Sequence, residues 1–356
     1  MELAELEDWL RLAIAPGVGE AKLVKLITQY GDPKSIFHVD KETLKHQVGE
    51  EAANGIDNIK GYDVKRFVEI MDKLNIQLIP MTDAKYPKVL LQLSVPPPML
   101  FVRGELCDED TRGVAIVGAR KATNYGRNVA HHLAYELART GVTIISGMAR
   151  GIDTEAHKGA LEANGRTIAV WGSGLDWVYP AENRYLANHI INNGACVSEF
   201  PPRTRPEAGN FPRRNRIISA LSRAVIVVEA AITSGVMHTV RWALELGRDV
   251  LAVPGNITSR MSEGTNMLIA QGAHVITKVE DIFELLNIDY KVKKVEVELT
   301  DEEKSVLEVL TDEPQHVDDI AERLNMPVQR LTAILLTLEL KRQVKQLPGR
   351  NFIRLP

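Results

Sequence analysis

Short apolar runs alternate with helical stretches through the middle of the chain. The runs are nearly continuous rather than alternating with polar residues, which is typical of strands covered on both faces. Most of them are separated by segments of about 10–15 residues whose apolar positions follow the period of a helix. The runs are residues 114–117, 142–145, 167–170, 195–198, 224–228 and 250–253. This pattern predicts an α/β domain over residues 77–288, built from βαβ units around a parallel sheet.

Residues 1–76 follow a helical period instead. Leu6, Trp9 and Ile14 share one helical face, and the sequence Pro-Gly-Val-Gly at 16–19 interrupts it before a second helix begins. Two helices joined by a glycine turn resemble SAM-like and helix-hairpin-helix modules, in which the turn amides and a helix N-terminus hold a DNA phosphate. A purely structural turn between two helices fits the pattern equally well.

Residues 299–356 form a small module after a charged linker at 289–298. Thr300 and Glu303 have the spacing of a capping box at the start of a helix. A second helix is expected over 317–324, and Pro327 suits the start of a third that runs to about Arg342. The remaining residues read as a β-hairpin, so the module is predicted to be a winged helix.

Composition limits the classes of function. The 356 residues carry a net charge of −4, so a nucleic-acid site must be a local basic patch, because phosphate affinity depends on the cations at the contact. No apolar stretch approaches the length of a membrane span and no signal peptide is visible, which favours a cytoplasmic protein. Cys107 and Cys196 fit no metal or redox motif, so no metal site is expected.

Glycine and polar residues follow the predicted strands, and ligands of parallel sheets bind beyond the carboxyl ends. Gly118 and Arg120 follow the first run and together offer amides and a guanidinium to a phosphate. Ser234 and Gly235 precede a later helix in the same way. The absence of Gly-x-Gly-x-x-Gly speaks against a dinucleotide cofactor. A glycine-rich loop after the second run is a further candidate anion site, composed of Ser146, Gly147, Met148, Ala149 and Arg150.

The strongest basic segment lies between Arg203 and Arg223, which include six arginines and one carboxylate, Glu207. Arginine binds phosphate in a bidentate manner, and an aromatic ring in the same segment can stack on a base. The helical spacing of the apolar residues that follow indicates that one of these arginines is structural. The expected contacts are Phe211, Arg213, Arg214, Asn215 and Arg216.

These segments, in this order and spacing over about residues 78–285, resemble the DprA/Smf family. The resemblance implies an extended Rossmann fold without cofactor or catalysis. It also implies sequence-independent binding and protection of single-stranded DNA during natural transformation, loading of the RecA recombinase, and homodimers formed through the Rossmann domains. By the same resemblance, Arg120 is a phosphate-binding residue, 146–149 is a backbone phosphate clamp, and Phe211 packs on a base. Some family members carry a lysine shortly before that aromatic. Here 207–210 has none, and Arg203, Arg205 or Arg213 are candidates to replace it.

Two other classes of protein remain open. A phosphoribohydrolase of the related Rossmann group would carry a Pro-Gly-Gly-x-Gly-Thr-x-x-Glu loop, which residues 229–239 lack, and His157 and His238 read as packing or helix-surface residues. Glu229 can orient an arginine or bind a ribose. A transcription factor would act through the C-terminal module, whose last thirty residues are basic and whose first half is acidic. That module is compatible with either DNA or protein contacts.

Overall fold

The computed structural model describes residues 1–288, 299–311, 313–341 and 343–354. The chain divides into two compact units, Met1–Tyr290 and Lys291–Pro356. The predicted linker at 289–298 lies outside the described residues. The predicted boundary at residue 76 falls inside the first unit, so the separation of 1–76 from 77–288 stays a prediction.

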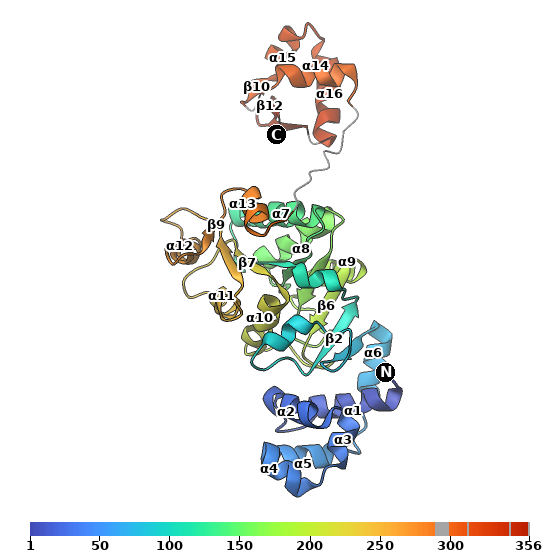
Figure 1. The fold of residues 1–356 in the computed structure, drawn as a ribbon. Helices are drawn as coiled ribbons and strands as arrows, with labels where there is room; N and C mark the ends of the chain where they lie inside the picture. The colour runs from blue at the N-terminus through green and yellow to red at the C-terminus, as the bar shows by residue number, and fades with distance from the viewer. Residues whose placement is uncertain (289–298, 312, 342, 355–356) are drawn as a thin grey trace. The chain divides into compact units, whose positions relative to one another are not determined.

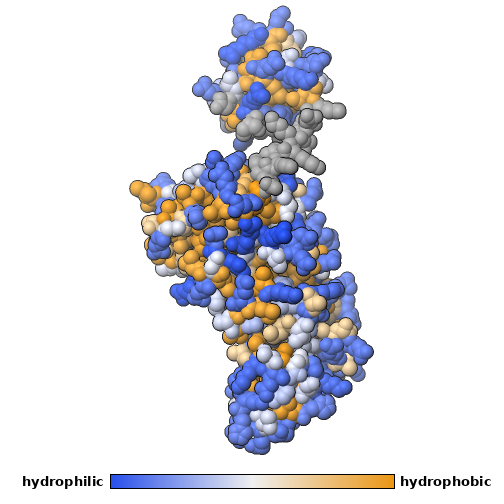
Figure 2. Space-filling view, in the orientation of Figure 1, coloured by the Kyte–Doolittle hydropathy of each residue, from blue (hydrophilic) through white to orange (hydrophobic). Residues whose placement is uncertain are grey.

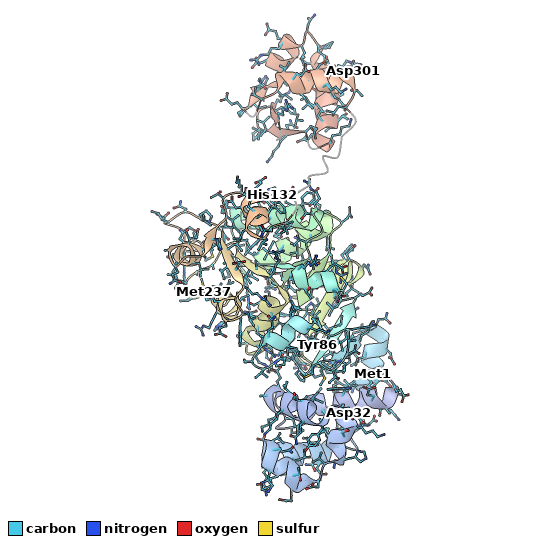
Figure 3. The ribbon with its side chains drawn as sticks, in the orientation of Figure 1. Met1, Asp32, Tyr86, His132, Met237 and Asp301 are labelled. Carbon is cyan, nitrogen blue, oxygen red and sulfur yellow. The ribbon has the colours of Figure 1, made fainter. Side chains whose placement is uncertain are left out.

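The first unit opens with a helical segment, and the predicted helix, glycine turn and second helix are present. Gly17 adopts a φ of +73°, and a Cβ there would lie 2.7 Å from the Glu51 side chain, so the turn needs glycine. Helix α3 begins after Asp32, which is labelled in Figure 3. The Asp32 side chain accepts a hydrogen bond from the Ser35 amide (2.8 Å). The helices are α1 (Leu3–Ile14), α2 (Glu20–Tyr30), α3 (Pro33–His38), α4 (Lys41–Val48), α5 (Glu50–Ile59) and α6 (Lys65–Leu74).

A nine-stranded sheet follows within the described residues, in the order β1-β2-β6-β5-β4-β3-β7-β8-β9 (Figure 1). All neighbours from β6 to β9 are parallel, whereas β2 is antiparallel to both β1 and β6. The six predicted strands are confirmed, and β1, β2 and β9 were not predicted. The strands are β1 (Gln77–Pro80), β2 (Met99–Gly104), β3 (Val114–Val117), β4 (Ile144–Ser146), β5 (Thr167–Val170), β6 (Gly194–Ser198), β7 (Ala224–Val227), β8 (Asp249–Ala252) and β9 (His274–Val275).

Both faces of the sheet are covered because successive side chains of each strand point to opposite faces. Val114 and Ile116 pack against α7 (Asn124–Arg139), α8 (Ile152–Glu162) and α13 (Glu280–Leu285). Ala115 and Val117 pack on the other side, where the helices are α10 (Asn210–Leu221), α11 (Val236–Glu245) and α12 (Glu263–Ala270). A further cluster joins the N-terminal helices to α9 (Arg184–Asn192) and the strand residues Phe101 and Cys196.

The chain order creates a switch point beside β3. From β3 the chain builds β4, β5 and β6 outward on one side, and then returns to place β7 on the other side of β3, with Val117 opposite Val227. The connections leaving β3 and β7 therefore diverge, which opens a crevice at their carboxyl ends.

The second unit contains the predicted three helices and hairpin. The capping box is confirmed: Glu303 accepts from the Thr300 amide (2.7 Å) and donates its own amide to the Thr300 hydroxyl (3.3 Å). Helix α16 ends at Leu340, whereas the expected end at Arg342 lies outside the described residues. The elements are α14 (Asp301–Val309), β10 (Gln315–His316), α15 (Val317–Arg323), α16 (Val328–Leu340), β11 (Val344–Leu347) and β12 (Asn351–Arg354).

Candidate nucleic-acid interface

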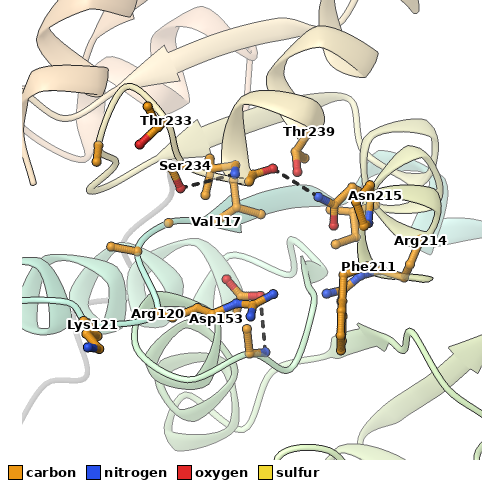
Figure 4. Close-up of a pocket in the computed structure, with 18 of the residues that line it drawn as sticks. Val117, Arg120, Lys121, Asp153, Phe211, Arg214, Asn215, Thr233, Ser234 and Thr239 are labelled. Carbon is orange, nitrogen blue, oxygen red and sulfur yellow. Dashed lines mark hydrogen bonds between the residues drawn. The ribbon is translucent and has the colours of Figure 1, made fainter. Parts of the chain in front are cut away.

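A cleft of about 470 Å³ lies at the switch point between the ends of β3 and β7. Figure 4 shows Arg120 and Lys121 on the β3 side, Ser234 on the β7 side, and Phe211 and Asn215 on α10. Segments far apart in the sequence thus contribute to one cavity. The residues of the cleft that sequence analysis named are Gly118, Arg120, Ala149, Phe211, Arg214, Asn215, Ser234 and Gly235.

Arg120 and Lys121 supply the accessible positive charge of the cleft. Both side chains are exposed. No salt bridge to either is found among the described residues, although the charge of Arg120 also acts on the buried Asp153 of the same cleft. The Arg120 guanidinium lies 5.2 Å from the centre of the Phe211 ring, a contact that holds the cation beside an aromatic face. The pairing places a phosphate-binding group next to a surface on which a base can stack.

Gly118 has a packing role at this rim. A Cβ at this position would lie 2.5 Å from Cγ1 of Ile152, the first residue of α8. Glycine therefore allows α8 to approach the end of β3. The residue type that suggested a phosphate turn is required by the contact between strand and helix.

The loop after β4 is not the open anion clamp that its sequence predicts. The Ser146 hydroxyl donates to the Ile116 carbonyl (2.6 Å), and Met148 is buried in the core. The Asp153 carboxylate accepts from the amides of Gly147 (3.1 Å) and Ala149 (3.3 Å; Figure 4). A buried carboxylate of the protein therefore holds two of the amide donors that were expected to meet a phosphate.

Arg214 is buried although it lines the cleft, so its predicted role as a phosphate contact stays a prediction. Its side chain is buried and donates to the Val170 carbonyl. The guanidinium lies so close to Gly147 that a Cβ there would fall 2.0 Å from Nη1. Burial lowers the pKa of Arg214 to about 10, although the charge of Asp153 opposes the shift. Burial raises the pKa of Asp153 against the opposing charge of Arg214.

Arg216 is the second arginine that the structure places inside. Its guanidinium donates to the Val95 carbonyl, to Glu199 (2.5 Å) and to Glu20 (2.8 Å). Arg213 is half-exposed and also pairs with Glu20 (2.7 Å). The expectation that one arginine of this helix is structural understates the finding, because both Arg214 and Arg216 are buried and Arg213 is paired.

The two carboxylates of this cluster differ in their protonation. Burial, followed by the hydrogen bond with Glu20, raises the pKa of Glu199 to about 8 against the charge of Arg216. Burial opposes the ionisation of Glu20 as well, but its hydrogen bond with Glu199 and the charges of Arg216 and Arg213 outweigh it and lower the pKa. Of the two carboxyls, the more deeply buried Glu199 therefore holds a proton to higher pH.

The α11 side of the cleft is formed by a short polar turn. Ser234 Oγ accepts from the Val236 amide (3.3 Å), and Asn215 Nδ2 donates to the Gly235 carbonyl (3.4 Å). Ser234 thus serves the start of α11, as its position before the helix indicates. Arg150, predicted to be part of the anion loop, forms an exposed ion pair with Glu182.

Glu229 and His157 have structural roles. Glu229 is buried and accepts from the Thr123 amide (2.9 Å) and hydroxyl (2.6 Å), which organises the start of α7. It neither orients an arginine nor faces the cleft as a ribose ligand. His157 is buried with Nδ1 2.7 Å from the Thr167 hydroxyl, which confirms its interpretation as a packing residue.

Sequence reasoning missed two residues of this surface. Lys121 lines the cleft, and its place directly after Arg120 was an available signal. Tyr179 lies with its ring centre 5.6 Å from that of Phe211, a proximity that only the tertiary fold creates. The candidates to replace the missing lysine lie apart from the cleft lining: Arg203 lies over Phe67, Arg205 over Trp177, and Arg213 over Phe200.

Two negative findings apply to the described ranges. None of their helices combines the length and apolar character needed to cross a membrane. They also contain no group of three or more His, Cys, Asp or Glu residues placed to hold a metal ion.

Comparison with known proteins agrees with this architecture. The profile of a family described as DNA recombination-mediator protein A matches residues 77–287, and that of a DprA winged helix domain matches residues 293–350. Protein Smf of Escherichia coli K12 is 43% identical over 298 residues, which are 80% of this chain and 79% of that protein.

Two solved structures share the fold. The X-ray structure of DNA processing protein A from Streptococcus pneumoniae matches with a TM-score of 0.71 and 31% identity, covering 80% of this chain and 98% of the other. DNA processing protein A from Helicobacter pylori, solved for its single-stranded DNA binding mode, matches with a TM-score of 0.55 and 32% identity, covering 61% and 98%. The extended Rossmann-like sheet domain and the C-terminal winged helix are thus confirmed. This chain belongs to the DprA/Smf family of DNA recombination mediators.

Proposed function

We propose that this protein is a cytoplasmic homodimer that binds single-stranded DNA without sequence preference, protects it and helps to load RecA, without catalysis. The observation that carries DNA binding is the exposed guanidinium of Arg120 beside the Phe211 ring, with Lys121 next to it in sequence, in a cleft at the sheet's switch point. Cations bind the backbone of any sequence, and a ring stacks on any base. A relative from Helicobacter pylori with the same fold binds single-stranded DNA.

The proposed contacts follow the accessibility of each group. Arg120 and Lys121 neutralise phosphates, Phe211 stacks on a base, and Asn215 with the turn at 234–235 contacts the strand from the α11 side. Arg213 can contribute only if a phosphate displaces Glu20 from it. Arg214 and Arg216 hold the surface in place from inside.

Two buried carboxylates near the cleft support the absence of catalysis. Glu229 is occupied by Thr123, and Asp153 by the Gly147 and Ala149 amides. Neither is free to act as a general base at the cleft. Turnover of a nucleoside monophosphate by the purified protein would contradict this part of the proposal.

Homodimer formation is supported by an exposed apolar edge. Val275 of β9, the edge strand, is exposed beside the polar His274, and Ile257 is exposed in the segment before α12. Figure 2 shows apolar residues gathered on the side of the first unit that carries α11, α12 and β9. An open strand edge with apolar side chains is suited to pairing with another copy. Val275→Asp is expected to shift the protein to monomers in light scattering.

The DNA-binding proposal is tested by fluorescence anisotropy with a mixed-sequence single strand and its duplex. Wild type should prefer the single strand, and log affinity should fall with log salt at a slope of about −0.7 per phosphate neutralised. Arg120→Ala should weaken binding and flatten this slope. Arg66→Ala removes an exposed arginine from the helical segment and is the matched control. Equal binding by the Arg120→Ala and control variants would overturn the assignment of the cleft.

Loading of RecA is tested separately. RecA filaments should assemble faster on single strands already coated with a single-strand-binding protein when the wild-type chain is added. The acceleration should disappear with Arg120→Ala. Acceleration that survives the loss of DNA binding would mean that RecA is reached by another route.

A further inference from the structure

Two large aromatic side chains are exposed beside the cleft but outside its lining. Trp177 and Tyr179 are 43% and 42% exposed, although rings of this size usually bury most of their surface. Both lie on the loop between β5 and α9. Tyr179 contacts Phe211, with ring centres 5.6 Å apart and planes tilted by 41°. The aromatic surface of the cleft therefore continues onto this loop.

An arginine side chain lies over the aromatic ring at each end of this surface. Arg120 lies 5.2 Å from the centre of Phe211, and Arg205 lies 5.6 Å from the centre of Trp177. Arg205 is exposed, and no carboxylate of the described chain forms an ion pair with it. Rings with adjacent free cations match the alternation of bases and phosphates along a single strand.

The loop holds its rings in place before any ligand arrives. The Ser173 hydroxyl donates to the Trp177 carbonyl (3.0 Å), and the Trp177 amide donates to the Gly174 carbonyl (3.0 Å). Asp176 accepts from the Arg203 amide (2.9 and 3.0 Å) and so ties this loop to the segment that carries Arg205. Pre-ordered groups lose less conformational entropy on binding.

We propose that Tyr179 and Trp177 are further base-stacking subsites, so that a single strand leaves the cleft past Phe211 and continues along the β5–α9 loop with Arg205 at its phosphates. This inference rests on the proposed binding of single-stranded DNA and extends it beyond the cleft. The surface discriminates against duplex DNA, because paired bases are already stacked and do not offer their faces.

Tryptophan fluorescence tests the contact directly. Trp9 and Trp171 are buried, so quenching on addition of oligothymidylate of about 16 nucleotides should come from Trp177. Trp177→Phe should abolish the quenching, whereas Trp242→Phe should retain it. Quenching that persists in Trp177→Phe would overturn the assignment of Trp177.

Affinity measurements test the energetic role. Tyr179→Ala and Trp177→Ala should each weaken binding of the oligonucleotide on the order of 5- to 100-fold, the range for loss of one stacked base. Tyr179→Phe should keep most of the affinity because it keeps the ring. Tyr185→Ala is the matched control, since Tyr185 is 82% exposed on α9.

The outcomes separate the two proposals. Loss of binding with Arg120→Ala, but none with Tyr179→Ala or Trp177→Ala, would overturn the extended surface and leave the cleft assignment standing. A wild-type protein that binds no single strand would overturn both. Variants with unchanged thermal unfolding and reduced affinity would support the extended surface.

Discussion

The Arg216 guanidinium donates a hydrogen bond of 2.5 Å to the carboxyl group of Glu199 in the interior of the first unit. The arginine comes from α10, whose N-terminal turn faces the cleft, and the glutamate follows β6. Glu20 at the start of α2 joins the same arginine at 2.8 Å. One guanidinium therefore links the sheet, the helix that carries Phe211 and the N-terminal helical segment.

Replacing Arg216 should affect folding more than DNA contact. Arg216→Ala leaves the buried Glu199 and its neighbour Glu20 without their shared hydrogen-bond donor, and a buried polar group that loses its partner costs about 1–3 kcal/mol. The free energy of unfolding in urea measures this loss. Arg213→Ala on the same helix is the control and should cost less than about 1 kcal/mol, because its ion pair is half-exposed. Equal losses in the two variants would contradict the structural role of Arg216.

The Glu199 carboxyl should make stability depend on pH. Its pKa is raised from 4.5 to about 8, so between these values the folded state holds a proton that the unfolded state has lost. Stability from this group is therefore lost as pH rises through that window. Glu199→Gln mimics the protonated form. In this variant the free energy of unfolding in urea should decline less steeply between about pH 6 and 8, the upper part of the window.

Glu182→Gln is the matched control for this pH experiment, because Glu182 is exposed and pairs with Arg150. Its stability curve should run parallel to that of the wild type. A Glu199→Gln curve that is also parallel to the wild type would show that Glu199 does not titrate in this range.

The buried His157 should make the protein sensitive to acid. Burial, reinforced by the charge of Arg214, lowers the pKa of His157 from 6.5 to about 3. Between these values the unfolded state binds a proton that the folded state excludes, so stability is lost as pH falls through the window. His157→Gln should reduce the slope of stability against pH there, whatever its effect at neutral pH. An unchanged slope would contradict a neutral, buried imidazole.

Gly147 should tolerate no side chain. A Cβ at this position would lie 2.0 Å from Nη1 of the buried Arg214, so Gly147→Ala must displace the guanidinium from Val170. Overpacking of this kind costs about 1–3 kcal/mol, measured by chemical unfolding. Gly209→Ala is the control at the start of α10, where a Cβ would meet nothing within 4 Å. Comparable stability of both alanine variants would contradict this packing.

Local pattern was sufficient for much of the fold. The six central strands were predictable because each is a nearly continuous apolar run, and the capping box at Thr300 because its signal is two residues at a set spacing. Strand β9 was missed because it has two residues, too few for a period. Strand β1 was missed because it includes Pro80, and a proline, which cannot donate to the strand ladder, argues against a strand.

The candidate site also combines features that are local in the sequence with features that depend on packing. Sequence alone determined that Arg120 and Phe211 belong to a basic, aromatic rim of an α/β sheet, because strand ends and charge clusters are local features. Only the tertiary structure decided that Arg214 and Arg216 are interior while Arg120 remains open, and that Tyr179 meets Phe211. Whether a charge is paired depends on carboxylates such as Glu20 and Glu199, which are far away in the chain. The packing of the whole unit sets the positions of these carboxylates, and the sequence pattern around the arginines does not reveal them.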